Sequence, residues 1–343
     1  MSEAKRRLCG GPATKGRAIP AGAVSRTAMA ARARKWAEEG WSPGAIVRAV
    51  NRGFDRQLRV VIAGAVRDLA DGGRLIPPVS FCWVLLGSGG RRELTLHSDQ
   101  DHALVVADAE AVAAAVREYF RTLAERVVAR LEALGYSLCP GFVLPTNPRW
   151  NGTEKAWREA IEGYLAVPHW AHVRYLLLAV DMRPVFGDLR LARRLHAWVV
   201  ARLRDAPFVL WMAAARNQER AVALDWRLRL RVDVSGPRAG AVDIKEGGYL
   251  PLVNAVRLWA VAEGVRATST ERRIAVLERR GVWDASFAAR VQEALATLEA
   301  YRLWDNHVNV ARLSAVDREA LRLALRTVKA LQARTAKHFR KPK

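Results

Sequence analysis

Two short apolar runs joined by a glycine-rich segment constrain the fold of this chain more than any other feature. Residues 81–86 are too short for a helix and rich in aromatic and branched side chains, so a buried strand is expected there, and residues 101–107 are expected to form a second. The segment between them, residues 87–101, begins with Gly-Ser-Gly-Gly and ends with Ser-Asp-Gln-Asp. A glycine turn should therefore close one strand, and two carboxylates should open the next.

The glycine turn has the composition of a phosphate cradle. Gly87 can adopt backbone angles closed to other residues, and the amides of Ser88, Gly89 and Gly90 could converge on an anion. Arg91 could add positive charge. Strings of this kind are also common as plain turns, so by itself the motif leaves that alternative open.

Asp99 and Asp101 are the candidate metal ligands. On an extended chain residues two apart face the same way, so both carboxylates could offer hard oxygen ligands to Mg²⁺ and leave positions for phosphates and water. A lone Asp-x-Asp is more often a solvated acidic turn. The order of the features favours a site, because adjacent strands would bring the turn and the carboxylates together. The combination indicates metal-assisted phosphoryl or nucleotidyl transfer.

The rest of the chain is mainly helical in pattern. Residues 175–180 fit either a strand or a buried helix, and we favour a strand, with regular structure ending near Pro184. Apolar residues and arginines alternate over residues 226–232, which predicts a hairpin that returns at residues 241–244. Helices are expected at residues 24–39, 43–74, 110–135, 153–164, 249–263, 270–280, 285–303 and 314–340.

Composition indicates a globular protein with a basic surface. The 343 residues carry a formal net charge of +22, which attracts nucleic acid, nucleotides, acidic proteins or anionic lipid. The arginines are spread along the chain, which weakens the case for a dedicated nucleic-acid interface, and a bias toward arginine and alanine is an alternative cause. Three scattered cysteines indicate neither a disulfide framework nor a zinc site. The chain lacks a signal-peptide pattern and any apolar run of roughly 18–20 residues, so a cytoplasmic location without membrane contact is expected.

Several motifs in order along the chain resemble a known family. The Gly-Ser-x-Gly-Arg-x-Glu and Ser-Asp-x-Asp patterns are similar to those of nucleotidyltransferases of the DNA polymerase β superfamily. The nearest likeness is to the branch related to the PII-protein uridylyltransferase, which often accompanies cyclic-nucleotide-binding and CBS domains. The likeness covers about residues 25–340, and its further matching segments are residues 139–141, 147–150, 181–188, 243–247 and 270–272.

The resemblance implies a role for each matching residue. Gly87 and Ser88 would contact the triphosphate of an NTP substrate, with Asp99 and Asp101 binding two Mg²⁺ ions. Asp181 would be the third carboxylate, a metal ligand on a neighbouring strand that helps to activate the attacking hydroxyl.

Three of the candidate residues have alternatives that the sequence leaves open. Gly90, Arg91 and Lys245 are candidates for phosphate binding, yet Arg91 could instead pair with Glu93 and brace the loop, and Lys245 could be an ordinary surface lysine. Asp181 could form a local charge pair with Arg183.

The fold class expected is α+β, a small mixed nucleotidyltransferase sheet flanked by helices, with a helical C-terminal domain. Residues 1–22 should be a disordered basic tail, 23–76 an N-terminal helical arm, 77–190 the nucleotidyltransferase domain and 191–343 the mainly helical domain. Residues before 25 leave no room for the regulatory modules of the related branch, so any such regulation is expected from a partner chain.

The function expected is Mg²⁺-dependent transfer of NMP from an NTP to an acceptor hydroxyl, with a protein as the favoured acceptor. One alternative is a catalytically silent module that senses a nucleotide. Another is a basic RNA-end nucleotidyltransferase or nucleic-acid binder, which the net charge permits but which no RNA-binding motif supports.

Overall fold

The computed structural model describes residues 19–71, 77, 79–108 and 114–342. Most of the predicted basic tail, and the predicted helix ends at residues 72–74 and 110–113, lie outside these residues. Two helices form the N-terminal part, α2 (Arg26–Glu38) and α3 (Pro43–Asp71). Ser25 caps α2 by accepting a hydrogen bond from the amide of Ala28 at 3.1 Å, which satisfies a helix-end donor.

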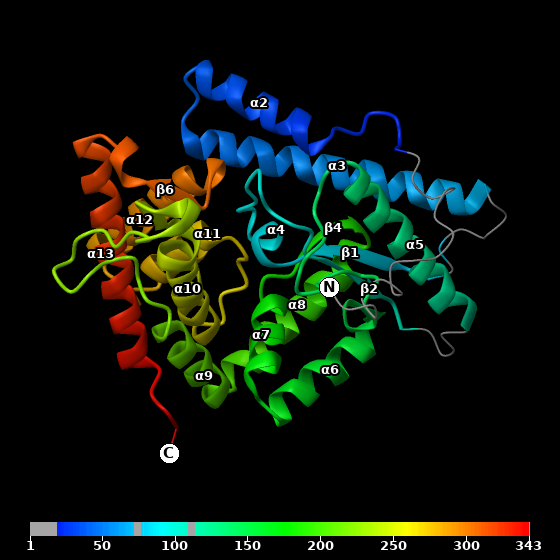
Figure 1. Cartoon of the computed structure of the whole chain (residues 1–343). Coiled ribbons are helices and arrows are strands. Elements are labelled where there is room, and N and C mark those ends of the chain that lie inside the picture. The colour runs from blue at the N-terminus through cyan, green and yellow to red at the C-terminus, as the bar shows by residue number, and fades with distance from the viewer. Residues whose placement is uncertain (1–18, 72–76, 78, 109–113, 343) are drawn as a thin grey trace.

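A four-stranded mixed sheet forms the centre of the nucleotide-binding half expected from the sequence. Its strands are β1 (Phe81–Leu85), β2 (His102–Val106), β3 (Asn151–Thr153) and β4 (Arg183–Gly187). Their order is β3-β2-β1-β4, with β1 antiparallel to both β2 and β4, and β2 parallel to β3. Together with the helices around it, this sheet confirms the predicted α+β class (Figure 1).

Helices cover both faces of the sheet, which explains why its central strands are apolar throughout. Phe81, Trp83 and Leu85 of β1 lie in one cluster with side chains of α3 and α5 (Ala114–Ala133). The alternate residues Cys82 and Val84 lie in the other cluster, with α7 (Trp170–Ala179) and α8 (Leu189–Arg204). Successive strand residues point to opposite faces, so burying both faces requires an unbroken apolar run.

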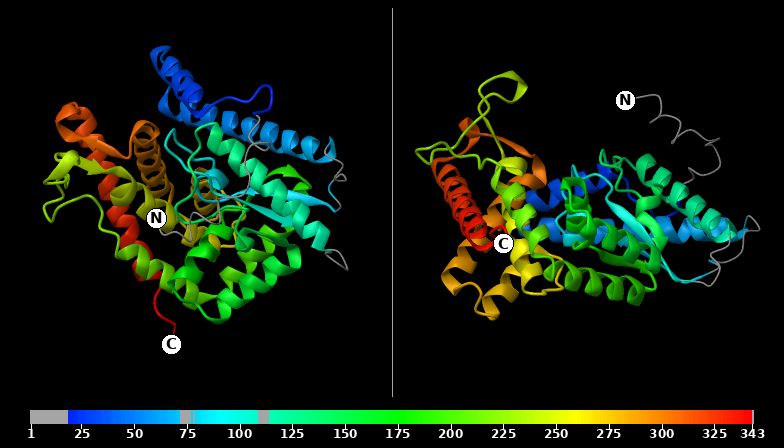
Figure 2. Two further views of the ribbon diagram at one scale, coloured as in Figure 1. Left: turned by 45° about the vertical axis from the view of Figure 1, so that its right-hand side comes forward. Right: turned by 90° about the horizontal axis from the view of Figure 1, so that it is seen from below.

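The C-terminal half is helical, and its helices gather beside the sheet-bearing half (Figures 1 and 2). All four helices predicted from residue 249 onward are present, with ends within two residues of the prediction. A π-helix (Lys245–Tyr249) leads directly into α10. The remaining elements are α6 (Glu154–Ala166), α9 (Pro207–Gln218), α10 (Leu250–Ala262), α11 (Thr270–Arg279), α12 (Ala285–Trp304), α13 (Ala315–His338), β5 (Ala241–Asp243) and β6 (His307–Asn309). In the described residues, none of the helices combines the length and apolar character that crossing a membrane requires.

The predicted strand at residues 175–180 is wrong, because this segment belongs to helix α7 and the turn after it. Val173, Leu176 and Leu177 are buried at helical spacing, and the apolar run alone could not separate this pattern from a strand. The strand begins later, as β4, and contains Pro184. β4 is an edge strand of the sheet, where a proline without an amide hydrogen is tolerated.

The predicted hairpin at residues 226–232 and 241–244 is also wrong. β5 pairs instead with β6, more than 60 residues later in the chain. The Asp225 side chain accepts hydrogen bonds from the amides of Arg227 and Arg229, and Leu228 has a left-handed φ of 60°. This local turn breaks the extended conformation. Trp226 is 79% exposed, whereas Leu228, Leu230 and Val232 are partly buried against the core, so the alternation reflects packing of this turn rather than a strand.

Candidate active site

The predicted glycine turn is a short helix, α4 (Gly87–Arg91), which follows β1 directly. Before it starts, the amide of Leu86 donates a 2.9 Å hydrogen bond to the carbonyl of Asp101, extending the pairing of β1 with β2. Gly87 has a φ of +49°, and a β-carbon there would lie 2.9 Å from Oδ2 of Asp101. The structure therefore brings the start of α4 and one predicted metal ligand into contact, at a position where only glycine leaves room.

Asp99 and Asp101 are close enough for the charge of Asp99 to act on Asp101. The intervening Gln100 is bonded within the protein: its amide donates to the carbonyl of Tyr136 at 2.8 Å, and its Oε1 lies 3.0 Å from Nε2 of His102. Both aspartates are half-buried. Burial, reinforced by the negative charge of Asp99, raises the pKa of Asp101 to about 6.

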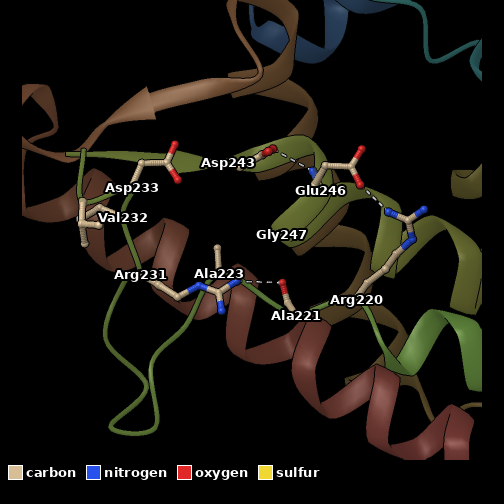
Figure 3. A pocket seen from close by; sticks show the side chains of 10 residues that line it. Arg220, Ala221, Ala223, Arg231, Val232, Asp233, Asp243, Glu246 and Gly247 are labelled. Atoms are coloured by element: carbon tan, nitrogen blue, oxygen red, sulfur yellow. Dashed lines mark hydrogen bonds and ion pairs between the residues drawn. The ribbon is translucent and has the colours of Figure 1, made fainter. Parts of the chain in front are cut away.

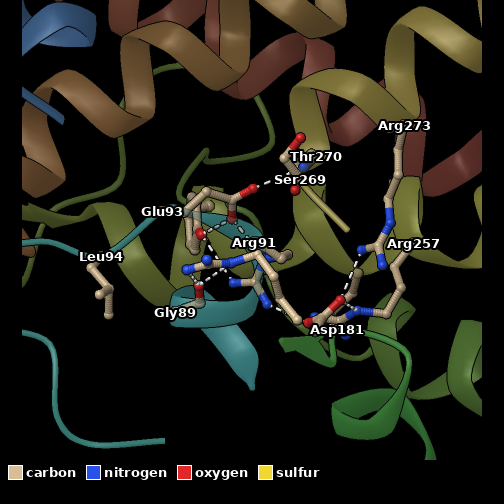
Figure 4. A network of polar contacts seen from close by, with 12 residues as sticks. Gly89, Arg91, Glu93, Leu94, Asp181, Arg257, Ser269, Thr270 and Arg273 are labelled. Atoms are coloured by element: carbon tan, nitrogen blue, oxygen red, sulfur yellow. Dashed lines mark hydrogen bonds and ion pairs between the residues drawn. The ribbon is translucent and has the colours of Figure 1, made fainter. Parts of the chain in front are cut away.

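Asp181 is the third predicted carboxylate, and its surroundings differ from those of the other two. It lies in the turn between α7 and β4 and is fully buried. Three guanidinium groups occupy its oxygens (Figure 4). The distances are 2.5 Å from Nη1 of Arg91, 2.7 Å from Nη2 of Arg257 and 2.8 Å from Nη1 of Arg273. Burial alone would raise the pKa of Asp181, but these charges, with Arg257 foremost, hold it well below its usual range.

Arg91 is held on every side by protein groups. Its Nε donates to Glu93 at 2.6 Å, its Nη1 to Asp181, and its Nη2 to the Tyr249 hydroxyl at 3.0 Å. The Tyr249 hydroxyl in turn donates to Glu93, and the amide of Thr270 donates to the other Glu93 oxygen at 2.9 Å. The predicted pairing of Arg91 with Glu93, which braces the loop, is confirmed. The cluster ties α4 to the π-helix and α11 (Figure 4).

The other predicted phosphate-binding residues lie in three different environments. Ser88 is half-buried on α4, while Gly90 is buried against the main chain of Asp181. Lys245 is exposed at the first position of the π-helix, where the Asp243 side chain accepts a hydrogen bond from the amide of Glu246 at 2.8 Å. Phosphate binding by these side chains stays a prediction.

A charged cavity of about 500 Å³ lies beside the segment that contains Lys245 (Figure 3). Arg220 on its wall forms an ion pair with Glu246, and Arg231 donates to the carbonyl of Ala221 at 3.3 Å. Asp243 lines the cavity, but Asp99, Asp101 and Asp181 do not. It is therefore separate from the predicted carboxylate site.

The three predicted carboxylates do not form one metal-binding cluster. Over the described ranges, no three His, Cys, Asp or Glu side chains are grouped so that they could hold a metal ion. Asp99 and Asp101 interact with each other, whereas both oxygens of Asp181 are taken by arginines. The arrangement offers two carboxylates beside a helix start, and Mg²⁺ commonly takes its remaining ligands from water and substrate phosphates.

Sequence reasoning missed the arginines that organise this region. Arg183 binds Asp55 of α3 through two hydrogen bonds, at 2.9 and 2.7 Å, and also donates to the carbonyl of Gly89 at 2.8 Å. Arg257 is the only charged residue of the apolar helix α10, and it is buried. A single arginine in such a helix is a sequence signal for a buried ion pair.

Comparison with known families agrees with this geometry. Residues 27–170 match the family described as putative nucleotidyltransferase DUF294, and residues 207–339 match its putative nucleotidyltransferase substrate binding domain. The chain belongs to this family. The DUF294 match contains Gly87, Asp99 and Asp101, and the substrate-binding match contains Lys245 and Arg257. Asp181 falls between the two matched ranges and is bonded to arginines from both. No curated protein matched the chain.

Proposed function

We propose that this DUF294 protein transfers NMP from an NTP to an acceptor hydroxyl in a Mg²⁺-dependent reaction. The observation that carries the proposal is the contact between Gly87, at the start of α4, and the carboxylate of Asp101. A helix start offers amide donors without partners within the helix, which suit phosphate oxygens. The same point of the molecule thus offers donors for a triphosphate and a carboxylate for a metal ion.

The donor set fits a hard divalent cation. Asp99 and Asp101 are close enough for the charge of one to raise the pKa of the other, and a cation bound between them would relieve this repulsion. Asp99 and Asp101 would hold the ion. When bound, Mg²⁺ would lower the pKa of the attacking hydroxyl and neutralise charge on the leaving pyrophosphate.

The residues of the chain itself would position the substrate. The amides at the start of α4 and the side chain of Ser88 would orient the triphosphate, and Lys245 would approach it from the C-terminal half. Arg91 and Glu93 would keep α4 rigid against the π-helix, since both are buried and bonded to Tyr249. We assign Asp181 a positioning role, because a carboxylate bound by three arginines is a weak base and a poor metal ligand.

A second candidate function is nucleotide sensing without turnover. The hydrogen bonds from arginines to Asp181 favour this second function, since the described residues then contribute two carboxylates to the site rather than three. Both candidates predict NTP binding, and only the first predicts release of pyrophosphate. The acceptor class proposed for the first is a protein with an accessible hydroxyl, and a partner chain would supply any regulatory domain.

The proposal is tested with α-labelled ATP, CTP, GTP and UTP, each with Mg²⁺, by measuring pyrophosphate release and label transfer to proteins of a cell extract. Asp99→Asn and Asp101→Asn are expected to lower the rate at least about 100-fold, because each removes a charged metal ligand. Asp71→Asn is the matched control, since Asp71 is exposed at the end of α3. Unchanged rates in both site variants would overturn the proposed mechanism, and saturable binding without pyrophosphate would favour the sensor.

A further inference from the structure

Arg174 of α7 extends its guanidinium over the turn at residues 139–142. Gly141 of that turn has no side chain, and a β-carbon there would lie 2.5 Å from Nη2 of Arg174 and 3.6 Å from Sγ of Cys139. The guanidinium and the thiol therefore both border the space above Gly141. The missing side chain at position 141 leaves the room that Arg174 occupies.

The same turn is in contact with the predicted metal site. The chain on both sides of the turn is bonded to the residues that flank Asp101: the amide of Gln100 donates to the carbonyl of Ser137 at 2.9 Å, and the amide of His102 donates to the carbonyl of Val143 at 3.1 Å. Asp101 acts on the pKa of Cys139, and the positive charge of Arg174 partly offsets the rise in the pKa of Asp101. Arg174 is nevertheless exposed and forms no ion pair within 4.0 Å with a carboxylate among the described residues. Its charge acts on Asp101, and the side chain is open to solvent.

The other arginines around the site are used differently. Arg91, Arg257 and Arg273 are buried and bonded to Asp181, and Arg183 is buried and bonded to Asp55. Their donors are already satisfied by the protein, so they hold the fold together. Arg91 and Arg174 are the arginines whose charges are found to act on Asp101 among the described residues, and Arg174 can give its donors to a ligand without breaking a buried ion pair.

We propose that Arg174 binds the phosphates of the nucleotide and makes the site selective for a triphosphate over a monophosphate; this rests on the function proposed above. A triphosphate approaching Asp99 and Asp101 brings further negative charge, which one divalent cation offsets only in part. A guanidinium offers paired donors that match phosphate oxygens. The nucleotide would then lie between the start of α4 and the turn at Gly141, with Arg174 on the α7 side.

Two kinds of variant test this role. Arg174→Ala removes the guanidinium, and Arg174→Lys keeps the charge without the paired donors. Gly141→Ala leaves Arg174 in the chain but places a methyl group where its guanidinium lies. The backbone of Gly141 is outside the left-handed region, so alanine there should fold, and the flexible arginine tip should move instead. Arg190→Ala is the control for loss of one exposed positive charge, because α8 begins at the end of β4 that is remote from α4.

Binding of each of the four NTPs and the corresponding NMPs, with Mg²⁺, is measured by calorimetry, and folding is checked by circular dichroism. Arg174→Ala is expected to weaken NTP binding about tenfold or more while NMP binding changes less than about twofold. Gly141→Ala and Arg174→Lys should weaken NTP binding less, and Arg190→Ala should not change it.

The outcomes separate this inference from the proposed function. One outcome overturns the role of Arg174 and leaves the nucleotidyltransferase site standing. In that outcome the wild-type protein binds an NTP, and Asp101→Asn weakens this binding whereas Arg174→Ala does not. Equal losses of NTP and NMP affinity in Arg174→Ala would also overturn triphosphate selectivity. If the wild-type protein binds none of the four NTPs, both proposals are overturned.

Discussion

Gly90 lies directly against the main-chain carbonyl of Asp181. A β-carbon at position 90 would be 1.9 Å from that oxygen and 3.0 Å from the carbonyl oxygen of Leu85. The contact presses α4 onto the turn between α7 and β4, and it brings Arg91 within 2.5 Å of the Asp181 carboxylate. The position of α4 therefore depends on a glycine at position 90 and on a buried acid far away in the sequence.

We expect Gly90→Ala to lower the free energy of unfolding by about 3 kcal/mol or more, because backbone on two sides must move to admit the methyl group. Gly89→Ala is the control in the same helix. A β-carbon at position 89 would meet the Leu85 side chain at 3.4 Å, an ordinary contact, so a change within about 1 kcal/mol is expected. Urea denaturation measures both, and equal stability of the two variants would contradict the packing described for Gly90.

We expect Asp181→Asn to lower the free energy of unfolding by about 3–5 kcal/mol, because it leaves three buried guanidinium groups without their counter-charge. The pKa of Asp181 is lower in the folded than in the unfolded protein. Its contribution is therefore complete above the unfolded pKa of about 3.9 and is lost as the pH falls toward the folded value. The stability difference between wild type and variant should be constant from about pH 5 to 8 and shrink in more acid solution. If the stability difference between wild type and Asp181→Asn instead grew as the pH fell, the pKa of Asp181 could not be lower in the folded protein.

Glu299 of α12 is expected to make stability fall as the pH rises. Burial, followed by the negative charge of Glu93, raises the pKa of Glu299 to about 8. A carboxyl with a raised folded pKa binds a proton more tightly in the folded state, so stability declines between about pH 4.5 and 8, by at most about 1.4 kcal/mol per pH unit. The charged groups that act on it are Glu93, Glu271, Arg91 and Arg302.

Glu299→Gln should remove this slope and leave the variant more stable than the wild type at pH 8. Glu293→Gln on the same helix is the control, since Glu293 is exposed. Chemical denaturation at pH 5, 6.5 and 8 gives the free energy of unfolding of the wild type and of each variant as a function of pH. Parallel curves for wild type and Glu299→Gln would show that Glu299 is not held protonated by its surroundings.

Removal of divalent metal is expected to leave the fold unchanged, because the described residues contain no cluster of three ligands that could bind a structural ion. EDTA should not alter the circular dichroism spectrum or the melting temperature of the free protein. Mg²⁺ together with a bound NTP should raise the melting temperature by mass action, corresponding to about 2.7 kcal/mol at a ligand concentration 100 times Kd. Asp101→Asn should abolish that rise, and a chelator that unfolds the free protein would indicate a structural metal instead.

The two strands within residues 81–106 were predictable because their signals are local, whereas the glycine segment between them was predicted as a turn and is a short helix. Apolar runs of five or six residues and the Asp-x-Asp spacing act over a few positions, so neighbouring residues alone determine which way the side chains point. The helices of the C-terminal half were predictable for the same reason, and local side chains such as Ser269, which caps α11, help to fix where they begin.

The two errors in the fold have a common cause. Residues 175–180 and 226–232 have apolar patterns that fit more than one conformation, and partners elsewhere in the chain decide between them. Pro184 lies in a strand because that strand is at the edge of the sheet. β5 pairs with β6 because the intervening helices bring residue 307 next to residue 243.

The chain sequence by itself determined the α+β class and the two strands that flank the glycine segment, since each follows from the preferences of adjacent residues. Only the tertiary structure decided what Asp181 does. Arg257 and Arg273 are 76 and 92 residues away from it, and no spacing rule predicts that their guanidinium groups meet its carboxylate. The packing of the helices determines which counter-charges lie beside a buried charge, and that packing depends on the whole fold.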